Sequence, residues 1–144
     1  MVLGGRIRTP LDDDRGNLAG RANLKGFAFE YMTAGRAVVL GDPGPWLCSG
    51  MTGGKVYCHL DEEMGMNRAA LHRRIARGAG VEICDLEGED VTAIEELLSQ
   101  YHRELLHSNQ DEEAAWVAGV ITRCRSRFVK IAPGKTVVEP LNTE

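Results

Sequence analysis

Long apolar runs, paired cysteines and an excess of positive charge are all missing from this sequence of 144 residues. No apolar run approaches the roughly 18 residues of a membrane-spanning helix. The first ten residues, MVLGGRIRTP, lack the apolar core of a secretory signal. A formal net charge of −4 leaves no basic footprint for nucleic acid. Together these absences predict a cytoplasmic protein that binds neither membrane nor nucleic acid.

Cysteine is scarce, and its spacing excludes the common metal sites. The sequence has four cysteines, none in the Cys-x₂₋₄-Cys spacing of structural zinc sites and none in a clustered iron–sulfur pattern. In a reducing compartment such cysteines are expected to be free thiols that behave as small buried hydrophobes.

Glycine is abundant and unevenly distributed. Twelve of the 17 glycines lie in residues 1–65, where the apolar runs FAF, AVVL and KVY are too short to form helices. The remainder of the chain carries longer periodic stretches. The composition therefore predicts a turn-rich β region followed by a helical region.

Part of the β region is repeated. MTAG at Met32 and MTGG at Met51 lie 19 residues apart, and each is followed by a basic residue and a short apolar run. A Gly-Arg or Gly-Lys pair occurs four times at spacings of 15, 15 and 19, at Gly5, Gly20, Gly35 and Gly54. Repetition at this scale favours stacked coils with parallel strands, in which glycine turns the corners. A β-meander with glycine turns is the alternative.

Periodicity predicts three helices and two strands after residue 65. A short helix starts at Asn67 and ends at Gly78 or Gly80, and a strand follows at 81–86. Asp90 is expected to cap a longer helix whose apolar stripe continues to Leu105. Asn109, with Glu112 three residues later, resembles a capping box for a last helix. A closing strand is expected at 127–133.

Several segments together resemble one known family. EYMTAGRAVVLG, CSGMTGGKVY, LLSQYHRELLHSNQDEEAAWVAGVI and FVKIAP are similar to the C-terminal GXGXG domain of the glutamate synthase large (alpha) subunit. The resemblance covers roughly residues 4–133. No literal G-x-G-x-G occurs here, and the N-terminal side is shorter than in the family. The chain therefore resembles a shortened version of that domain.

The resemblance implies a fold. The family has a right-handed parallel β-helix, so we expect a mainly β protein with stacked coils over about residues 2–65. A helical cap and final strand are expected at 66–133 and a loose tail at 134–144, all within a single domain, 1–144.

The resemblance also implies a function without chemistry of its own. In the family this domain is a scaffold between a glutamine amidotransferase centre and a flavin centre, where the amide nitrogen is transferred to 2-oxoglutarate. We therefore expect no catalytic residue, cofactor or metal in this chain. The alternative is a stand-alone β-helix assembly module outside glutamate synthesis. A hexapeptide acyltransferase is disfavoured, because the spacings do not fit a six-residue period.

Some residues are considered for chemistry on their own. The candidates are Cys48 and Cys58-His59 as metal ligands, Asp61-Glu62-Glu63 as an acid–base cluster, and residues 41–46 as a phosphate loop. Cysteines in a coil stack mostly fill its core, adjacent acids are usually solvated, and the loop lacks a Gly-Lys-Ser/Thr ending. The histidines His72, His102 and His107 follow no ligand spacing.

A row of arginines and an uncovered coil point to docking. Arg68, Arg73, Arg74 and Arg77 could bind an anion, but a structural or docking use is favoured. The first expected coil, Val2–Arg8, has no coil before it, and bare parallel edges tend to pair. We therefore predict association through this coil, with amidotransferase and flavin subunits or with another copy of the chain.

Overall fold

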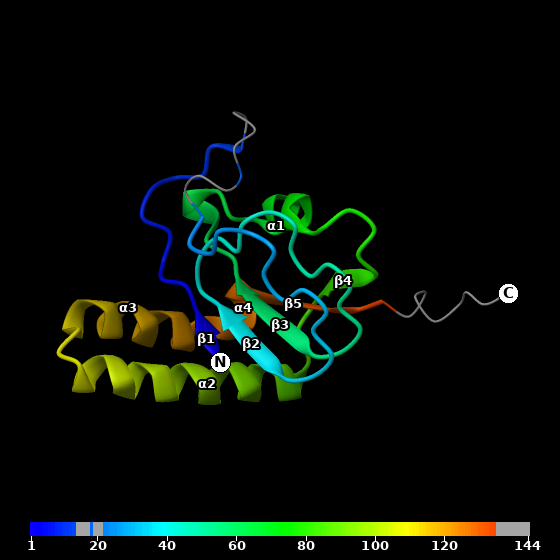
Figure 1. The fold of residues 1–144 in the computed structure, drawn as a ribbon. Coiled ribbons are helices and arrows are strands. Elements are labelled where there is room, and N and C mark those ends of the chain that lie inside the picture. Colours follow the sequence, from blue (N-terminus) through cyan, green and yellow to red (C-terminus); the bar gives the residue numbers. More distant parts are fainter. Residues whose placement is uncertain (14–17, 19–21, 135–144) are drawn as a thin grey trace, which may run out of the picture.

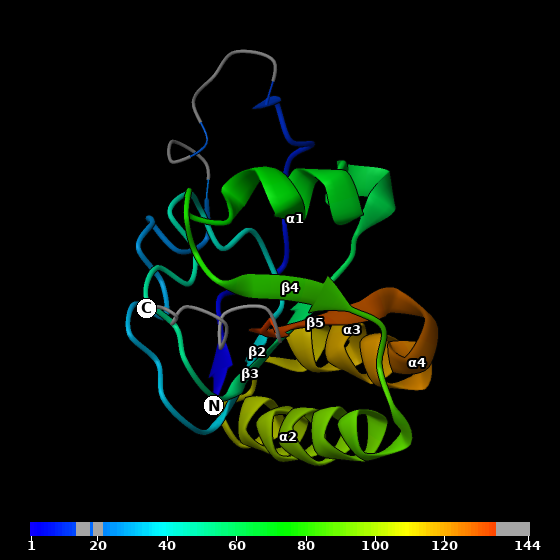
Figure 2. The same cartoon turned by 90° about the vertical axis from the view of Figure 1, so that its right-hand side faces the viewer.

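The computed structural model describes residues 1–13, 18 and 22–134, arranged in three layers. A mixed sheet forms the middle layer, with helix α1 and irregular loops on one face and helices α2 and α3 on the other (Figures 1 and 2). The strand order in the sheet is β1-β2-β3-β5-β4. The strands are β1 (Val2–Leu3), β2 (Arg36–Val39), β3 (Lys55–His59), β4 (Val81–Cys84) and β5 (Phe128–Pro133).

The sheet corrects the predicted fold class. Strands β1, β2 and β3 are parallel neighbours, but β5 pairs antiparallel with β3, and β4 pairs antiparallel with β5. Antiparallel pairs supply the larger part of the sheet's residue pairs. The prediction of a right-handed parallel β-helix over residues 2–65 is therefore wrong. The physical reason is that the closing segment, FVKIAP, returns alongside β3 in the opposite direction and occupies the place where a further parallel coil would stack.

The sequence repeat nevertheless corresponds to a register. Arg36 is paired with Lys55 and Val39 with Cys58, so β2 and β3 are offset by the 19 residues that separate MTAG from MTGG. The apolar run FAF forms no strand, because Phe27, Phe29 and Tyr31 have left-handed backbone conformations. Gly20-Arg21, part of the expected repeat, lies outside the described residues.

Four α-helices lie in the described part of the chain: α1 (Arg68–Arg74), α2 (Gly88–His107), α3 (Asp111–Thr122) and α4 (Cys124–Arg127). A short 3-10 helix, η2 (Glu62–Met64), precedes α1. Helix α1 begins as predicted, with the Asn67 side chain accepting a hydrogen bond from the N–H of Ala70.

Two predicted caps are wrong. The N-cap of α2 is Glu87, and Asp90 is the third helical residue of the same capping box. The N-cap of α3 is Gln110 without a side-chain hydrogen bond, because Asn109 has a φ of 60° and belongs to the turn after α2. In both cases the helix type is correct and its start is displaced.

Two apolar clusters lie on opposite faces of the sheet. Alternation along the strands sends Val39, Val56 and Cys58 toward α1 and the loops, and Val38 and Tyr57 toward α2 and α3. Ile7, expected on a bare edge coil, is buried in the first cluster. The N-terminal segment thus contributes to the core after its two-residue strand.

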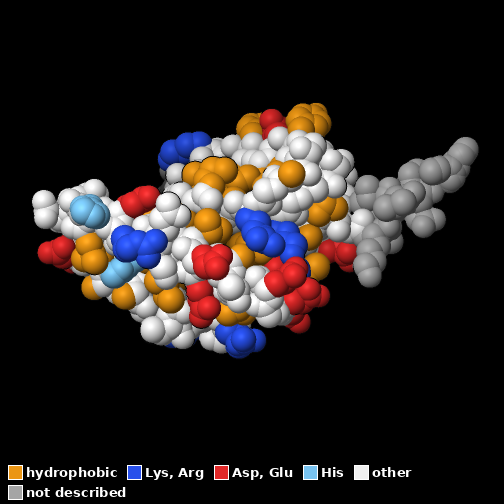
Figure 3. Space-filling model, turned by 90° about the horizontal axis from the view of Figure 1, so that it is seen from below, with side chains coloured by type: hydrophobic (Ala, Val, Ile, Leu, Met, Phe, Trp, Pro, Cys, Tyr) orange, Lys and Arg blue, Asp and Glu red, His pale blue; other side chains and the backbone are white. Residues whose placement is uncertain are grey.

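The surface formed by α2 and α3 is mixed in charge. Acidic and basic side chains are interspersed there rather than gathered by sign (Figure 3). No helix in the described part of the chain is long and apolar enough to cross a membrane. The interpretation of residues 1–144 as one domain stays a prediction, and most of its predicted tail, 134–144, lies outside the described residues.

Candidate functional site

The repeated segments form two loops that stack on one another. The N–H of Phe27 donates to the carbonyl of Pro45 at 2.9 Å, and the N–H of Tyr31 donates to Ser49 at 2.8 Å. In the opposite sense, Thr52 donates to Met32 at 2.9 Å. These bonds extend the register of β2 and β3 into the loops, so the two copies of the motif lie side by side.

Both loops share an unusual backbone pattern. Four pairs of positions, each 19 residues apart, have positive φ: Phe27 and Trp46, Phe29 and Cys48, Tyr31 and Gly50, and Gly35 and Gly54. Most are not glycine, and a large side chain at positive φ carries a cost of order 1–3 kcal/mol. The stacking hydrogen bonds and the buried side chains of the loops must offset that cost.

The alternation places aromatic side chains on the outside of the loops. Phe27, Tyr31 and Trp46, called the aromatic patch below, are 54%, 72% and 50% exposed. The rings of Phe27 and Trp46 stack with centroids 4.7 Å apart. The ring of Tyr31 lies against Gly50, where a Cβ atom would collide with it. The aromatic patch is therefore ordered by the loops and presented to solvent.

A buried arginine fastens the loops to α1. Arg74 is 1% exposed and donates to both oxygens of Asp42, at 2.7 and 3.2 Å. It also donates to both oxygens of Asp13, at 2.9 and 2.8 Å. The hydrogen bonds from Arg74 lower the pKa of Asp13 to about 2, although burial acts in the opposite direction. This network is a structural ion cluster whose donors are all used.

The network answers two questions raised by the sequence. Arg73 binds Asp13, and Arg68 binds Asp85, so three of the four arginines serve structural contacts. In the loop 41–46, Asp42 turns its carboxylate to Arg74 and to the N–H of Gly44. A carboxylate occupies the place where a phosphate loop would need donors, so this loop is a rigid corner.

A second buried carboxylate fastens α2 to the opposite face. Asp90 is fully buried and accepts hydrogen bonds from Lys130 at 2.6 Å, Tyr57 at 2.9 Å and Lys55 at 3.2 Å. Burial alone would raise the pKa of Asp90, but the hydrogen bonds from Lys130, the Glu87 N–H and Tyr57 hold it well below its usual range. Burial, together with Asp90, raises the pKa of Tyr57 to about 12. The carboxylate thus accepts hydrogen bonds from four donors.

The cysteines and histidines considered as ligands are dispersed. Cys48 and Cys58 are buried in the apolar cluster between the sheet and α1, called the loop-side core below. Burial raises the pKa of the Cys48 thiol to about 12. His59 packs between Trp116 and Phe128. Within residues 1–13, 18 and 22–134, no three His, Cys, Asp or Glu side chains are placed to hold a metal ion. His72 lies on α1, whereas His102 and His107 lie on α2.

Sequence reasoning missed the buried ionic residues. These residues lie far apart in the chain and follow no motif: Asp13, Asp42, Asp90 and Lys130. A partial signal exists for Lys130 alone, because it interrupts the apolar run FVKIAP. Asp61 is the N-cap of η2, and Glu62 and Glu63 are its first two residues.

Comparison with known proteins identifies the family. The family model described as the GXGXG motif matches residues 21–134. That match includes both stacked loops, α1, both long helices and the final strand. A search of curated proteins found no match. The chain belongs to the GXGXG motif family, which is the glutamate synthase GXGXG domain family.

Proposed function

We propose that this chain is a non-catalytic scaffold domain or subunit of a glutamate synthase system. In that role it holds an amidotransferase centre and a flavin centre in register while glutamine amide nitrogen passes to 2-oxoglutarate. Membership of the GXGXG family supports a glutamate synthase-related domain. The docking role is inferred from the side chains that the chain exposes on its surface.

The aromatic patch is the observation that carries the proposal. Three large aromatic side chains are exposed on adjacent turns of a rigid double loop. Aromatic residues are enriched at the centres of protein interfaces, where they supply much of the binding energy. Phe27 and Tyr31 lie in the loop before β2 and Trp46 lies in the loop before β3, so the stacking register of the two loops sets the shape of the surface.

The N-terminal coil is the other docking surface predicted from the sequence. Only Val2 and Leu3 form an edge strand there, because Arg6 and Arg8 bind Glu113 of α3 and Ile7 is buried. Association through residues 2–8 stays a prediction. The aromatic patch offers the larger exposed apolar surface, and we therefore place docking there.

The test removes the aromatic rings of Phe27 and Trp46 and keeps the backbone conformation of the two loops. Asparagine tolerates positive φ, so Phe27→Asn with Trp46→Asn should preserve the loops while removing the stacked pair. The variant chain is mixed with purified amidotransferase and flavin subunits of a glutamate synthase, and complex formation is measured by sedimentation velocity. We expect wild type to bind and the double variant to bind at least about tenfold more weakly, a loss of about 1.4 kcal/mol.

Leu106→Asn is the matched control, because Leu106 is 47% exposed but lies on α2. This control should bind like wild type. A wild-type chain that binds neither subunit would refute the scaffold role. Equal binding by wild type and the double variant would keep the scaffold and move docking away from the aromatic patch.

A further inference from the structure

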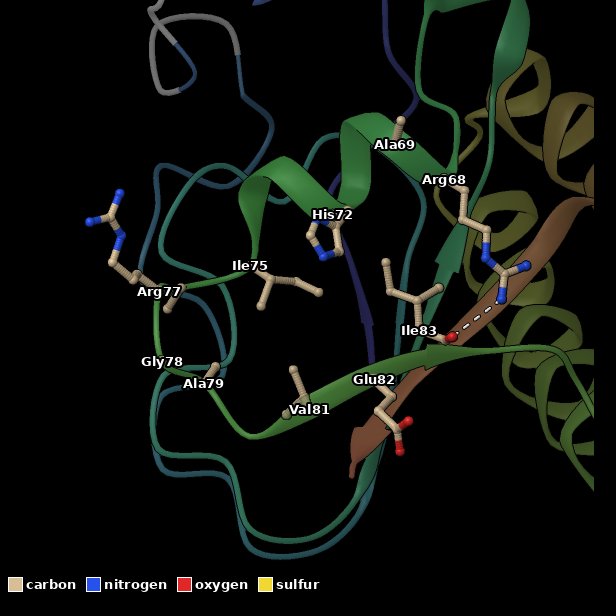
Figure 4. Close-up of a pocket in the computed structure, with 11 residues that line it drawn as sticks. Arg68, Ala69, His72, Ile75, Arg77, Gly78, Ala79, Val81, Glu82 and Ile83 are labelled. Carbon is tan, nitrogen blue, oxygen red and sulfur yellow. Dashed lines mark hydrogen bonds between the residues drawn. The ribbon is translucent and has the colours of Figure 1, made fainter. Parts of the chain in front are cut away.

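A groove of about 670 Å³ runs between α1 and the edge strand β4. Figure 4 shows α1 above the groove and β4 below it. Side chains of Ile75, Val81 and Ile83 lie between them, half-buried against the loop-side core. This volume lies within the range of well-formed binding sites, roughly 300–1,000 Å³.

The hydrogen-bonding direction of β4 leaves its outer edge open. The N–H of Gly134 donates to the carbonyl of Gly80 at 2.9 Å, which makes Gly80 and Gly134 a hydrogen-bonded pair of the antiparallel ladder. Hydrogen-bonded pairs alternate along an antiparallel ladder, so the backbone N–H and C=O of Glu82 also point toward β5. The backbone N–H and C=O groups of Val81 and Ile83 therefore point away from β5, toward the outer edge of the sheet. The bond of 3.2 Å from Arg68 to the Ile83 carbonyl confirms that direction.

The side chains around the groove are basic. Arg68 and His72 lie along the groove, and Arg77 lies at its end with its guanidinium pointing outward (Figure 4). Arg77 makes no hydrogen bond or ion pair among the described residues. The acid that also borders it, Glu82, points from β4 to the opposite side (Figure 4). The ion pair of Arg68 involves Asp85, whose side chain is 89% exposed, and exposed pairs are weak. A chain with a net charge of −4 thus has a basic rim at this edge.

We propose that the groove binds an extended strand of a partner polypeptide in which aliphatic and acidic residues alternate. The strand adds to the edge of β4, where it pairs with the outward backbone groups of Val81 and with the N–H of Ile83, while the Ile83 carbonyl accepts from Arg68. The aliphatic side chains of the partner strand pack in the groove against Ile75, and its carboxylates form ion pairs with the basic rim. This inference rests on the proposed scaffold role, because it names a second surface through which the scaffold holds a partner.

Charge excludes a second copy of the chain as the preferred occupant. A two-fold symmetric contact through this edge would bring the same patch of both copies together. Arg68 and Arg77 would then face the same two arginines of the other copy, and like charges across an interface are unfavourable. A strand with acidic side chains avoids that repulsion.

The experiment uses a defined probe on the full chain. A fluorescent peptide of alternating valine and glutamate, about eight residues long to match a typical strand, is titrated and its anisotropy measured. A peptide with lysine in place of glutamate is the control probe. We expect saturable binding of the acidic peptide and at least about tenfold weaker binding of the basic one.

Two variants test the groove itself. His72→Glu with Arg77→Glu reverses the rim, and Val81→Pro removes an edge N–H at the first residue of a strand, where proline is tolerated. Each should weaken acidic-peptide binding at least about tenfold with an unchanged circular dichroism spectrum. Arg103→Glu, an exposed reversal on α2, should have no such effect.

Five results would overturn the inference, the first four of them with the full chain. These are no binding of the acidic peptide, equal binding of both peptides, an equal loss in Arg103→Glu, or dimerisation abolished by Val81→Pro. Binding seen only after residues 135–144 are removed would assign the groove to that segment of this chain, and would also overturn it. Failure here leaves the aromatic-patch result unchanged, because that assay uses whole subunits and a different surface.

Discussion

The two faces of the sheet are held by different physics. The face under α1 carries irregular loops with positive-φ positions, and a buried arginine fastens these loops to α1. The face over α2 and α3 carries regular helices that pack an apolar stripe against Val38 and Tyr57. The helices of that face are encoded by short-range periodicity, and the buried Asp90 then fastens α2 to the sheet through Tyr57 and Lys130. The conformation of the loop face itself depends on contacts between residues distant in sequence.

The largest expected effect removes the arginine that fastens the loop face. Arg74→Leu leaves Asp42 buried without its main partner, and breaking a buried ion cluster costs about 3–5 kcal/mol. Urea unfolding measures the loss. Arg73→Leu is the control, because Arg73 is 51% exposed and its pair with Asp13 should contribute about 0–1 kcal/mol.

Hydrogen exchange then sharpens the comparison between the faces. Backbone amides of α1 and the loops should lose protection in Arg74→Leu before those of α2 do. Equal destabilisation by Arg74→Leu and Arg73→Leu, or uniform loss of protection over both faces, would contradict a separate ionic anchor for the loops.

The second effect concerns the glycine corners of the loops. Gly54 has a φ of +87°, and a Cβ there would lie 2.8 Å from Met32 Cε and 3.0 Å from the Gly35 carbonyl. Gly35 has a φ of +94° but more room, with Met32 Cε 4.0 Å away. Gly54→Val and Gly35→Val should each destabilise by about 1–3 kcal/mol, with Gly54→Val the worse. Thermal unfolding of both variants checks this order. Melting temperatures equal to that of the wild type in both variants would show that neither position needs glycine.

The smallest effect is a pH dependence on the helical face. His59 is 7% exposed and packs against Trp116 of α3. Burial lowers the pKa of His59, and the nearby Arg127 and Arg123 lower it further. Asp61 and the Leu40 carbonyl act in the opposite direction but do not cancel the effect of burial. The unfolded state then binds more protons below a pH of about 6.5. Stability should therefore fall as the pH drops below that value, by at most about 1.4 kcal/mol per pH unit.

His59→Gln separates this titration from all others. The variant keeps a polar side chain but cannot be protonated, so its stability should depend less on pH between about 7 and 5. Guanidinium unfolding at several pH values measures the difference. Parallel pH profiles for the two proteins would show that His59 does not couple to folding.

The sequence alone determined several local features. Asn67 predicted the start of α1, the apolar stripe predicted α2, and FVKIAP predicted a strand, because each depends on neighbours within a few residues. The 19-residue repeat corresponds to the register of β2 and β3. The resemblance of MTAG and MTGG to a known family was confirmed by the family match over residues 21–134.

Only the tertiary structure decided how these pieces combine. The direction of β5 beside β3 turned an expected β-helix into a mixed sheet, and a short apolar strand carries no mark of its partner's direction. The side-chain partners of Arg74 and Asp90 come from residues 32 to 61 positions away, which no local pattern links. The groove beside β4 likewise exists only because α1 folds over an edge strand. Local chemistry selects elements, whereas direction, burial and edges follow from which elements pack together.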